Sequence, residues 1–364
     1  MAGTALYAQL LSSPVAPQND SPLFSVLPAE VRGAIYAYAL TDYPDPSPDK
    51  HYEATTCYTR PSYFAPRKND TQLLQTCRAV YQECWFMPFV LKEQTHWLTV
   101  GDRAPPEYNA SRNLRRLART LRQITEQQGQ ERVEIDRLRV FAQMWKLEAG
   151  DLADLLSTPY LHPRSLTLTI RHADWWFWEN DDPLRFEGKW IRRVCEAMSP
   201  SVREFRIELE SLVRKKDQID LIAKQMIDRW FFKRSDDVVL YADIEGGSWE
   251  ESRWSGTSKW HNQRWIRDET EPGRIDYYVL TITFRVQSAI ERRGGKISET
   301  ARHFAEHDIY KDSELKLHLP DHKNMVCHQP FIFEQSLGAD GEAWDSDAWE
   351  DDEDEGTTGF LMFD

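Results

Sequence analysis

Cysteine is scarce in this sequence. The 364 residues contain five cysteines, widely spaced, and no two of them form a C-x-x-C pair. An odd, dispersed set argues against a disulfide framework and is typical of reduced thiols in the cytoplasm or nucleus. No stretch approaches the roughly 18 apolar residues of a membrane span, and the apolar stretch at Leu10 and Leu11 is too short for a secretion signal. We therefore expect a cytoplasmic or nuclear protein that does not enter a membrane.

Motifs of the common enzyme classes are also missing. The sequence has no G-x-S-x-G turn, no phosphate-binding P-loop and no G-x-G-x-x-G signature. Its paired glycines, at 246–247 and 294–295, stand in turn contexts. We expect a protein that is not an enzyme, needs no cofactor and works by binding other proteins.

One pattern, H-F-A-E-H over residues 303–307, matches the inverted zinc-protease motif H-x-x-E-H. On a helix, His303 and His307 would lie one turn apart and could bind zinc, with Glu306 as general base. A catalytic zinc needs a third protein ligand, which those enzymes take from a glutamate well downstream. Here Glu314 and Glu334 are close by and the later glutamates are in the tail. Exposed helix histidines and no metal are the main interpretation, and a zinc-dependent hydrolase is the alternative.

Acidic residues outnumber basic ones, and the excess is local. The net charge is −14, but residues 340–355 alone carry ten acidic side chains and no basic one. Like charges at this density repel one another and cannot bury enough apolar area to offset ordering entropy. The sequence therefore predicts a disordered acidic tail over residues 338–364, and the overall charge gives no reason to expect nucleic-acid binding.

Two tryptophans interrupt the tail, Trp344 in E-A-W-D and Trp349 in D-A-W-E. Acidic residues around a lone tryptophan are typical of short peptides that insert one ring into a pocket on a basic receptor. The alternative is a solubilising end without a binding role. We predict that Trp344 and Trp349 contact a partner.

The first third of the chain reads as helical after a disordered start over residues 1–20. Pro28 suits the first turn of a helix, and Val31, Ile35, Tyr38 and Ala39 then fall on one face. A second helix is predicted over 70–86, ended by Pro88, and a third over 111–123. The third has a leucine stripe and five arginines, which could bind phosphate or an acidic protein, including the acidic tail, or could only form a solvated face.

The middle of the chain alternates between two periodicities. Strands are predicted over 137–141, 165–171, 203–210 and 237–242, with helical stretches between them near 148–157, 187–198 and 213–232. This alternation predicts parallel strands joined by right-handed crossovers. A curved sheet like that of leucine-rich repeats and a compact α/β layer both remain open. A further strand over 277–286 and a helix over 297–308 follow.

Two segments carry a family resemblance. They are S-P-L-F-S-V-L-P-A-E-V-R-G-A-I-Y-A-Y-A-L over 21–40 and L-L-Q-T-C-R-A-V-Y-Q-E-C over 73–84. Together they resemble the fungal F-box-like proteins, whose members are largely uncharacterised. Shorter runs at 166–171, 174–178, 254–258 and 263–265 also look like that group, so the resemblance spans roughly residues 21–290.

The resemblance implies a role in ubiquitin ligation. In a true F-box, the Leu-Pro start and the Cys-Arg helix dock on a Skp-type adaptor of a cullin–RING ubiquitin ligase, and the downstream domain holds a substrate protein. By position, the adaptor contact would be formed by Leu27, Pro28, Ile35, Leu40, Leu74, Cys77, Arg78 and Tyr81. The chain departs from the family in residues 41–70, an insertion with five prolines between the two helices. The alternative is that these residues only form the core of a helical pair.

A long segment over residues 245–273 is predicted to be a loop. It carries Trp249, Trp254, Trp260 and Trp265. Four tryptophans in water would be an apolar liability, so we expect at least two of them to be buried and the charged residues between them to point outward. A segment of this length held in place by aromatic rings is also suited to binding a protein partner.

These observations predict an α+β protein. An F-box-like helical module over 21–125 precedes an α/β domain over 133–335, which is leucine-rich-repeat-like or compact, and the acidic tail follows. The predicted function is a protein-interaction subunit, specifically a substrate receptor of a Skp–cullin–RING ubiquitin ligase. The alternatives are an interaction scaffold that works without the adaptor, and the zinc-dependent hydrolase.

Overall fold

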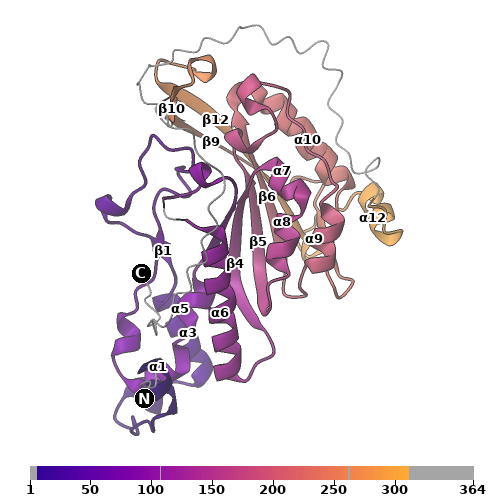
Figure 1. Cartoon of the computed structure of the whole chain (residues 1–364). Coiled ribbons are helices and arrows are strands. Elements are labelled where there is room, and N and C mark those ends of the chain that lie inside the picture. The colour runs from indigo at the N-terminus through magenta and orange to yellow at the C-terminus, as the bar shows by residue number, and fades with distance from the viewer. Residues whose placement is uncertain (1–5, 107, 261–262, 311–364) are drawn as a thin grey trace.

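The architecture is an eight-stranded mixed sheet with helices along one face and a helical module at one end (Figure 1). The computed structural model describes residues 6–106, 108–260 and 263–310. The strand order is β3-β4-β5-β6-β12-β8-β7, and β9 also pairs with β12. The strands of this sheet are β3 (Gln94–Leu98), β4 (Val133–Ala142), β5 (Leu161–Ile170), β6 (Glu204–Leu212), β7 (Phe232–Lys233), β8 (Val239–Ala242), β9 (Trp249–Thr257) and β12 (Arg274–Val286).

Four of these strands, β3 to β6, are parallel and adjacent in chain order. The predicted strands β4, β5 and β6 and their parallel pairing are confirmed. In an array of repeats each strand would pair in parallel with the next one in the chain. That arrangement ends after β6, because its other neighbour, β12, is antiparallel to β6, β8 and β9. The predicted strand over 237–242 forms β8 and runs in the same direction as β6, but it does not pair with β6, because β12 lies between them. The result is a mixed α/β structure with one large mixed sheet.

Helices connect the parallel strands and cover one face of the sheet. Each connection joins a strand to the next strand in the sheet, always in the same direction across it. Right-handed crossovers therefore place all of these helices on the same face. On β5, Leu166, Leu168 and Ile170 point into the core under them, while Thr167 and Thr169 alternate to the other face. The helices of this layer are α6 (Ala110–Gln128), α7 (Met144–Ala149), α8 (Asp151–Leu156), α9 (Ile191–Ala197) and α10 (Lys216–Arg229).

The helix α6 confirms the predicted third helix and extends it at both ends. Asn109 caps its start, because the Asn109 side chain accepts a hydrogen bond from the Arg112 backbone N–H at 2.8 Å. Gly129 ends it in the left-handed conformation at φ 62°. Both α6 and β3 belong to the sheet layer, so residues 94–128 are part of the α/β domain and not of the helical module to which the sequence assigns them.

The helical module consists of short helices at the lower end of Figure 1. Its core is formed by five buried residues, Tyr36, Leu40, Leu74, Val80 and Cys84. The helices are α1 (Leu6–Ser12), α2 (Pro22–Ser25), α3 (Ala29–Ala39), α4 (Arg78–Cys84) and α5 (Met87–Leu91).

The predicted disorder over residues 1–20 is wrong for the part that is described. The side-chain amide of Gln82 donates to the carbonyls of Leu10 at 2.9 Å and Ser13 at 2.9 Å, and Arg78 donates to the carbonyl of Pro14 at 2.9 Å. These bonds satisfy carbonyls that α1 and the turn after it leave without partners. The local sequence shows no such pattern, because both donors lie more than sixty residues away on α4.

The predicted second helix over 70–86 is interrupted. Cys77 is extended, at φ −159° and ψ 160°, and separates a 3₁₀ turn over Gln72–Gln75 from α4. Pro88 does not end this helix. It lies in the first turn of α5, where a missing N–H is tolerated.

The proline-rich insertion over residues 41–70 packs on the face of the sheet opposite the helices. Tyr63 contacts the rings of Trp97 and Phe141, with centroids 5.4 Å away in each case, and Trp97 stacks on Phe141 at 4.0 Å. Two strands, β1 (Tyr43–Pro44) and β2 (Arg67–Lys68), close the insertion at its base. The insertion therefore joins the helical module to the sheet.

The remaining elements follow the last parallel strand. The prediction of a helix over 297–308 is confirmed by α12, which Ser298 caps by accepting from the backbone N–H groups of Thr300 and Ala301. The predicted tail over 338–364 lies outside the described residues. These elements are β10 (Lys259–Trp260), β11 (Gln263–Arg264), α11 (Gln287–Glu291) and α12 (Glu299–Glu306).

Asp42 connects the helical module, the insertion and the sheet. Its fully buried carboxylate accepts hydrogen bonds from Arg67 Nε at 2.6 Å, from the Glu93 backbone N–H at 3.1 Å and from Arg137 on β4. Burial alone would raise the pKa of Asp42, but the bonds from Arg67 and Glu93 and the charge of Arg137 outweigh it and lower that pKa.

We predict that Asp42→Ala lowers the free energy of unfolding by about 3 kcal/mol, because it leaves two arginines without their shared buried carboxylate. Chemical denaturation monitored by circular dichroism measures this value. Asp49→Ala, at an exposed position of the same insertion, is the control and should cost less than about 0.5 kcal/mol.

Acid should remove the difference between Asp42→Asn and the unsubstituted protein. A carboxylate whose folded pKa is depressed contributes stability above its unfolded pKa and loses it as the pH falls through the folded pKa. The two unfolding free energies should therefore differ at pH 7, begin to converge below about pH 4 and meet only below the lowered folded pKa of Asp42. A difference that stays constant down to pH 2 would contradict the ionised pairing of Asp42.

Candidate functional site

The helix α3 presents an apolar surface to solvent. Val31, Ile35 and Tyr38 are 43%, 40% and 89% exposed, and Val26, just before the helix, is 72% exposed. The spacing of i, i+4 and i+7 places the three helical residues on one side. The sequence predicts that these residues share one face of the helix. The structure turns that face to solvent, because Tyr36 and Leu40 enter the core instead.

An ion pair explains why α3 is turned this way. Both oxygens of Glu83 on α4 accept from Arg32, at 2.6 and 3.0 Å, and the Tyr36 hydroxyl donates to Glu83 Oε2 at 2.9 Å. Arg32 also donates to the Leu27 carbonyl at 2.8 Å. The hydrogen bond from Arg32 lowers the pKa of Glu83. These bonds keep Tyr36 against α4 and leave the opposite side of α3 outward.

The eight residues implied by the family resemblance divide into two groups. Pro28 and Ile35 are exposed, Leu27 is half-buried, and Arg78 is exposed while holding the Pro14 carbonyl. Leu40 and Leu74 are buried in the module core, where they are not available to a partner, and Cys77 and Tyr81 pack against that core. The structure thus brings four of the eight together at one small core and leaves Pro28 and Ile35 exposed on the α3 side and Arg78 exposed on α4.

The tryptophan-rich segment over 245–273 is not an irregular loop. It contains β9, which pairs with β12 from Trp249 opposite Ile282 to Thr257 opposite Arg274. It also contains the short β10–β11 pair. The sequence did not reveal β9 because this strand is mostly exposed, so it lacks the apolar alternation of a buried strand.

The four tryptophans anchor this segment. Only Trp260 is fully buried, so the expectation of at least two buried rings is not met, but the other three are half-buried against the core. Trp254 stacks on Tyr277 at 4.3 Å and donates to Glu210 at 3.0 Å. The expected outward charges are confirmed: Glu250, Glu251, Arg253, Lys259 and Arg264 are all exposed. None of the four rings is an exposed anchor for a partner.

A buried charge cluster, missed by the sequence analysis, lies at the carboxyl ends of β5 and β6. Arg60 from the insertion pairs with Glu208 at 3.6 Å and with Glu210 at 3.5 Å. Next to it Arg171 forms two bonds with Asp174, at 2.6 and 3.0 Å. Open α/β sheets bind ligands at this edge.

The cavity at the charge cluster is too small for a substrate. It measures about 20 Å³, which is room for one water molecule. Arg60 Nε and Nη1 have no hydrogen-bond partner among the described residues, and such a water would satisfy them. The ion pairs of Arg60 and Arg171 therefore fill this edge of the sheet and leave no open site there.

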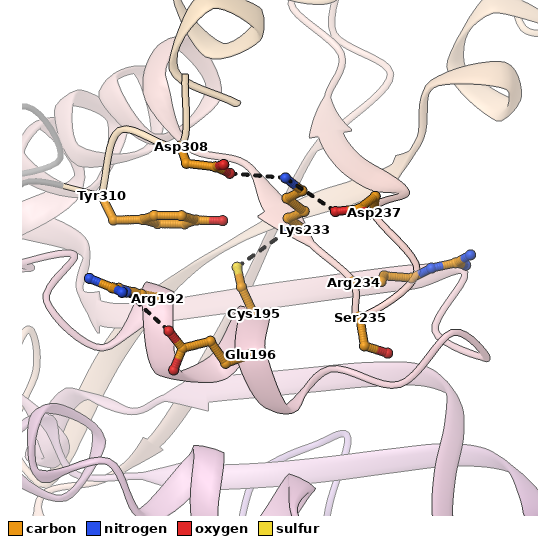
Figure 2. A pocket seen from close by; sticks show the side chains of 9 residues that line it. All are labelled: Arg192, Cys195, Glu196, Lys233, Arg234, Ser235, Asp237, Asp308 and Tyr310. Atoms are coloured by element: carbon orange, nitrogen blue, oxygen red, sulfur yellow. Dashed lines mark hydrogen bonds and ion pairs between the residues drawn. The ribbon is translucent and has the colours of Figure 1, made fainter. Parts of the chain in front are cut away.

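An open cavity of about 540 Å³ lies where α9, the β7–β8 turn and the residues after α12 meet (Figure 2). Lys233 binds Asp308 at 3.0 Å and Asp237 at 3.3 Å, so its ammonium is held as a cation. The Sγ of Cys195 accepts from the Lys233 backbone N–H at 3.3 Å, and burial raises the pKa of Cys195 to about 12. A thiol with that pKa is protonated at neutral pH and is a poor nucleophile. The paired lysine and protonated thiol give this cavity no activated group.

The two histidines of the H-x-x-E-H motif are exposed on and just after α12. Their ring centroids are 4.3 Å apart, and His307 Nδ1 lies 2.9 Å from the His303 carbonyl oxygen. Within the described residues, no group of three or more His, Cys, Asp and Glu side chains is placed to hold a metal ion. Trp344 and Trp349, the predicted partner-binding residues of the tail, lie outside the described residues.

Comparison with known proteins adds no relative: no family model, curated protein or solved structure matches this chain. Over the part of the chain that the structure describes, no helix is both long enough and apolar enough to cross a membrane. Among the surfaces and cavities described above, the exposed apolar side of α3 is the candidate site that the geometry favours.

Anchoring by the tryptophans can be tested one ring at a time. Trp260→Ala should lower the free energy of unfolding by about 3–5 kcal/mol, because it leaves a cavity between Trp178, Trp265 and His172. Trp145→Ala, at a ring that is 40% exposed, is the matched control and should cost less than about 1 kcal/mol. Equal, small losses in both variants would show that Trp260 does not hold the segment.

Proposed function

We propose that this protein is a protein-interaction subunit that docks through α3 on a Skp-type adaptor of a cullin–RING ubiquitin ligase. On this proposal the sheet domain holds the substrate protein. The observation that carries the proposal is the exposed apolar side of α3, together with the resemblance of residues 21–40 and 73–84 to an F-box.

The α3 surface has the chemistry of a helix that inserts into a groove. Its anchors, Val31, Ile35 and Tyr38, follow the i, i+4, i+7 pattern of such helices. Burying a large apolar side chain completely stabilises a complex by roughly 1.5–3 kcal/mol. Because Arg32 and Glu83 already fix the orientation of α3, little conformational entropy is lost on binding.

We also propose that the protein works in the cytoplasm or nucleus. Four of the five cysteines are described, and no two of these four form a disulfide. Free, buried thiols such as Cys84 are typical of a reducing compartment.

A scaffold that works without the adaptor is the second candidate. It is favoured by the burial of Leu40 and Leu74, two positions that the resemblance assigns to adaptor contact. It is also favoured by the insertion over 41–70, which a standard F-box lacks. On this alternative the same side of α3 binds a different protein.

The test compares two valines with similar exposure. Val31→Asp places a charge in the α3 surface, whereas Val238→Asp places one at a site that is 37% exposed on the β7–β8 turn. We predict that Val31→Asp weakens binding to a purified Skp-type adaptor about tenfold or more and that Val238→Asp leaves it unchanged. Isothermal titration calorimetry measures both affinities, and circular dichroism checks that both variants keep the fold.

Two results would decide between the candidates. If the unsubstituted protein does not bind the adaptor at micromolar concentration, adaptor docking is excluded. If Val31→Asp then still removes partners that co-purify with the full-length protein from cells, while Val238→Asp retains them, the scaffold without the adaptor is supported.

A further inference from the structure

One side of α6 carries a dense positive charge. Five arginines, at positions 112, 115, 116, 119 and 122, are exposed, and Glu126 is the one acidic residue of this helix. At 100° per residue these arginines cover one continuous arc opposite the buried stripe of Leu117 and Leu121. Arg112, Arg115, Arg119 and Arg122 form no ion pair with any residue that the structure describes.

An open cavity borders this arc. It has a volume of about 280 Å³ and lies between α6, β3 and α5. Its lining includes three apolar or aromatic side chains, Tyr63, Phe89 and Leu117, and three cationic ones, Arg67, Lys92 and Arg116. The one carboxylate of the lining, Glu93, is paired with Arg139 at 3.1 Å. Such a lining suits a planar aromatic ring, because guanidinium and ammonium groups are attracted to its face. The volume exceeds that of an indole.

We propose that the protein's own acidic tail docks on this surface. The carboxylates of residues 340–355 would lie along the arginines of α6, and Trp344 or Trp349 would enter the cavity. The two segments have complementary charges: residues 340–355 carry ten acidic side chains and no basic one, whereas α6 carries five arginines and a single glutamate. Each tail tryptophan is flanked by acidic residues. The ring would contact the apolar part of the cavity lining, and the flanking carboxylates would contact its cations.

The chain between the described body and the tail is long enough. Residues 311–341 separate Tyr310 from the first acidic tryptophan motif, and 31 residues span at most about 100 Å when extended. A folded body of about 300 residues is roughly 50 Å across. The tail can therefore reach α6 from α12, which lies at the right of Figure 1 beyond α9 and α10. Tethering also raises the effective concentration of the tail at its site.

The test is photo-crosslinking in the full-length protein. The photoreactive amino acid benzoylphenylalanine replaces Trp344, and mass spectrometry maps the crosslinks. We expect crosslinks within one chain to the lining of the cavity or to residues 112–122, at a yield independent of protein concentration. Because the contact is electrostatic and exposed, about 0.5 M salt should lower the yield roughly fivefold.

Charge reversal provides the matched control. Arg115→Glu with Arg119→Glu should lower the crosslink yield about fivefold, whereas Arg293→Glu with Arg302→Glu, two exposed arginines elsewhere, should leave it unchanged. Adding Glu342→Arg and Glu350→Arg to the α6 variant should restore the yield, which a misfolded variant could not do. Crosslinks elsewhere on the body, crosslinks only between two chains, or a yield insensitive to the α6 reversal would overturn the proposal.

Discussion

The carboxylate of Asp42 is the interaction on which the rest of the structure depends. It follows α3 directly and receives donors from the base of the insertion, from the start of β3 and from β4. A buried charge is stable only when several donors surround it. Asp42 therefore requires these three segments to meet at one point, which fixes the helical module against the first strands of the sheet. The aromatic contacts of Tyr63 then hold the insertion across the same strands.

Periodicity predicted the elements whose burial is one-sided. The strands β4, β5 and β6 alternate apolar and polar residues, and α6 repeats leucine every three or four positions, so both patterns were visible in the sequence. Elements held mainly by distant hydrogen bonds were not. The helix α1 depends on Gln82, and β9 depends on its ladder with β12. The orientation of α3 could not be predicted, because Arg32 and Glu83, rather than the number of apolar residues, decide which side is buried.

The candidate site was predictable in position but not in detail. The resemblance led to α3 and α4, but it could not show that Leu40 and Leu74 turn inward while Tyr38 is exposed. Likewise the alternating Glu208 and Glu210 resemble the solvent side of a strand. They became a buried cluster because Arg60, from the distant insertion, covers them. A periodicity shows that one face of a strand is polar, but not what covers that face.

The position of β12 has a consequence for synthesis of the chain. This strand pairs with β6 along the whole length of β6, from Glu204 to Leu212. Yet the end of β6 at Leu212 and the start of β12 at Arg274 are separated by a long stretch of sequence. At about 5–20 residues per second, a ribosome needs roughly 3–12 seconds to cover that distance. Throughout that interval β6 is an open sheet edge, which is a template for pairing with other chains. The nascent protein therefore passes through an aggregation-prone stage that ends only when β12 has left the ribosome.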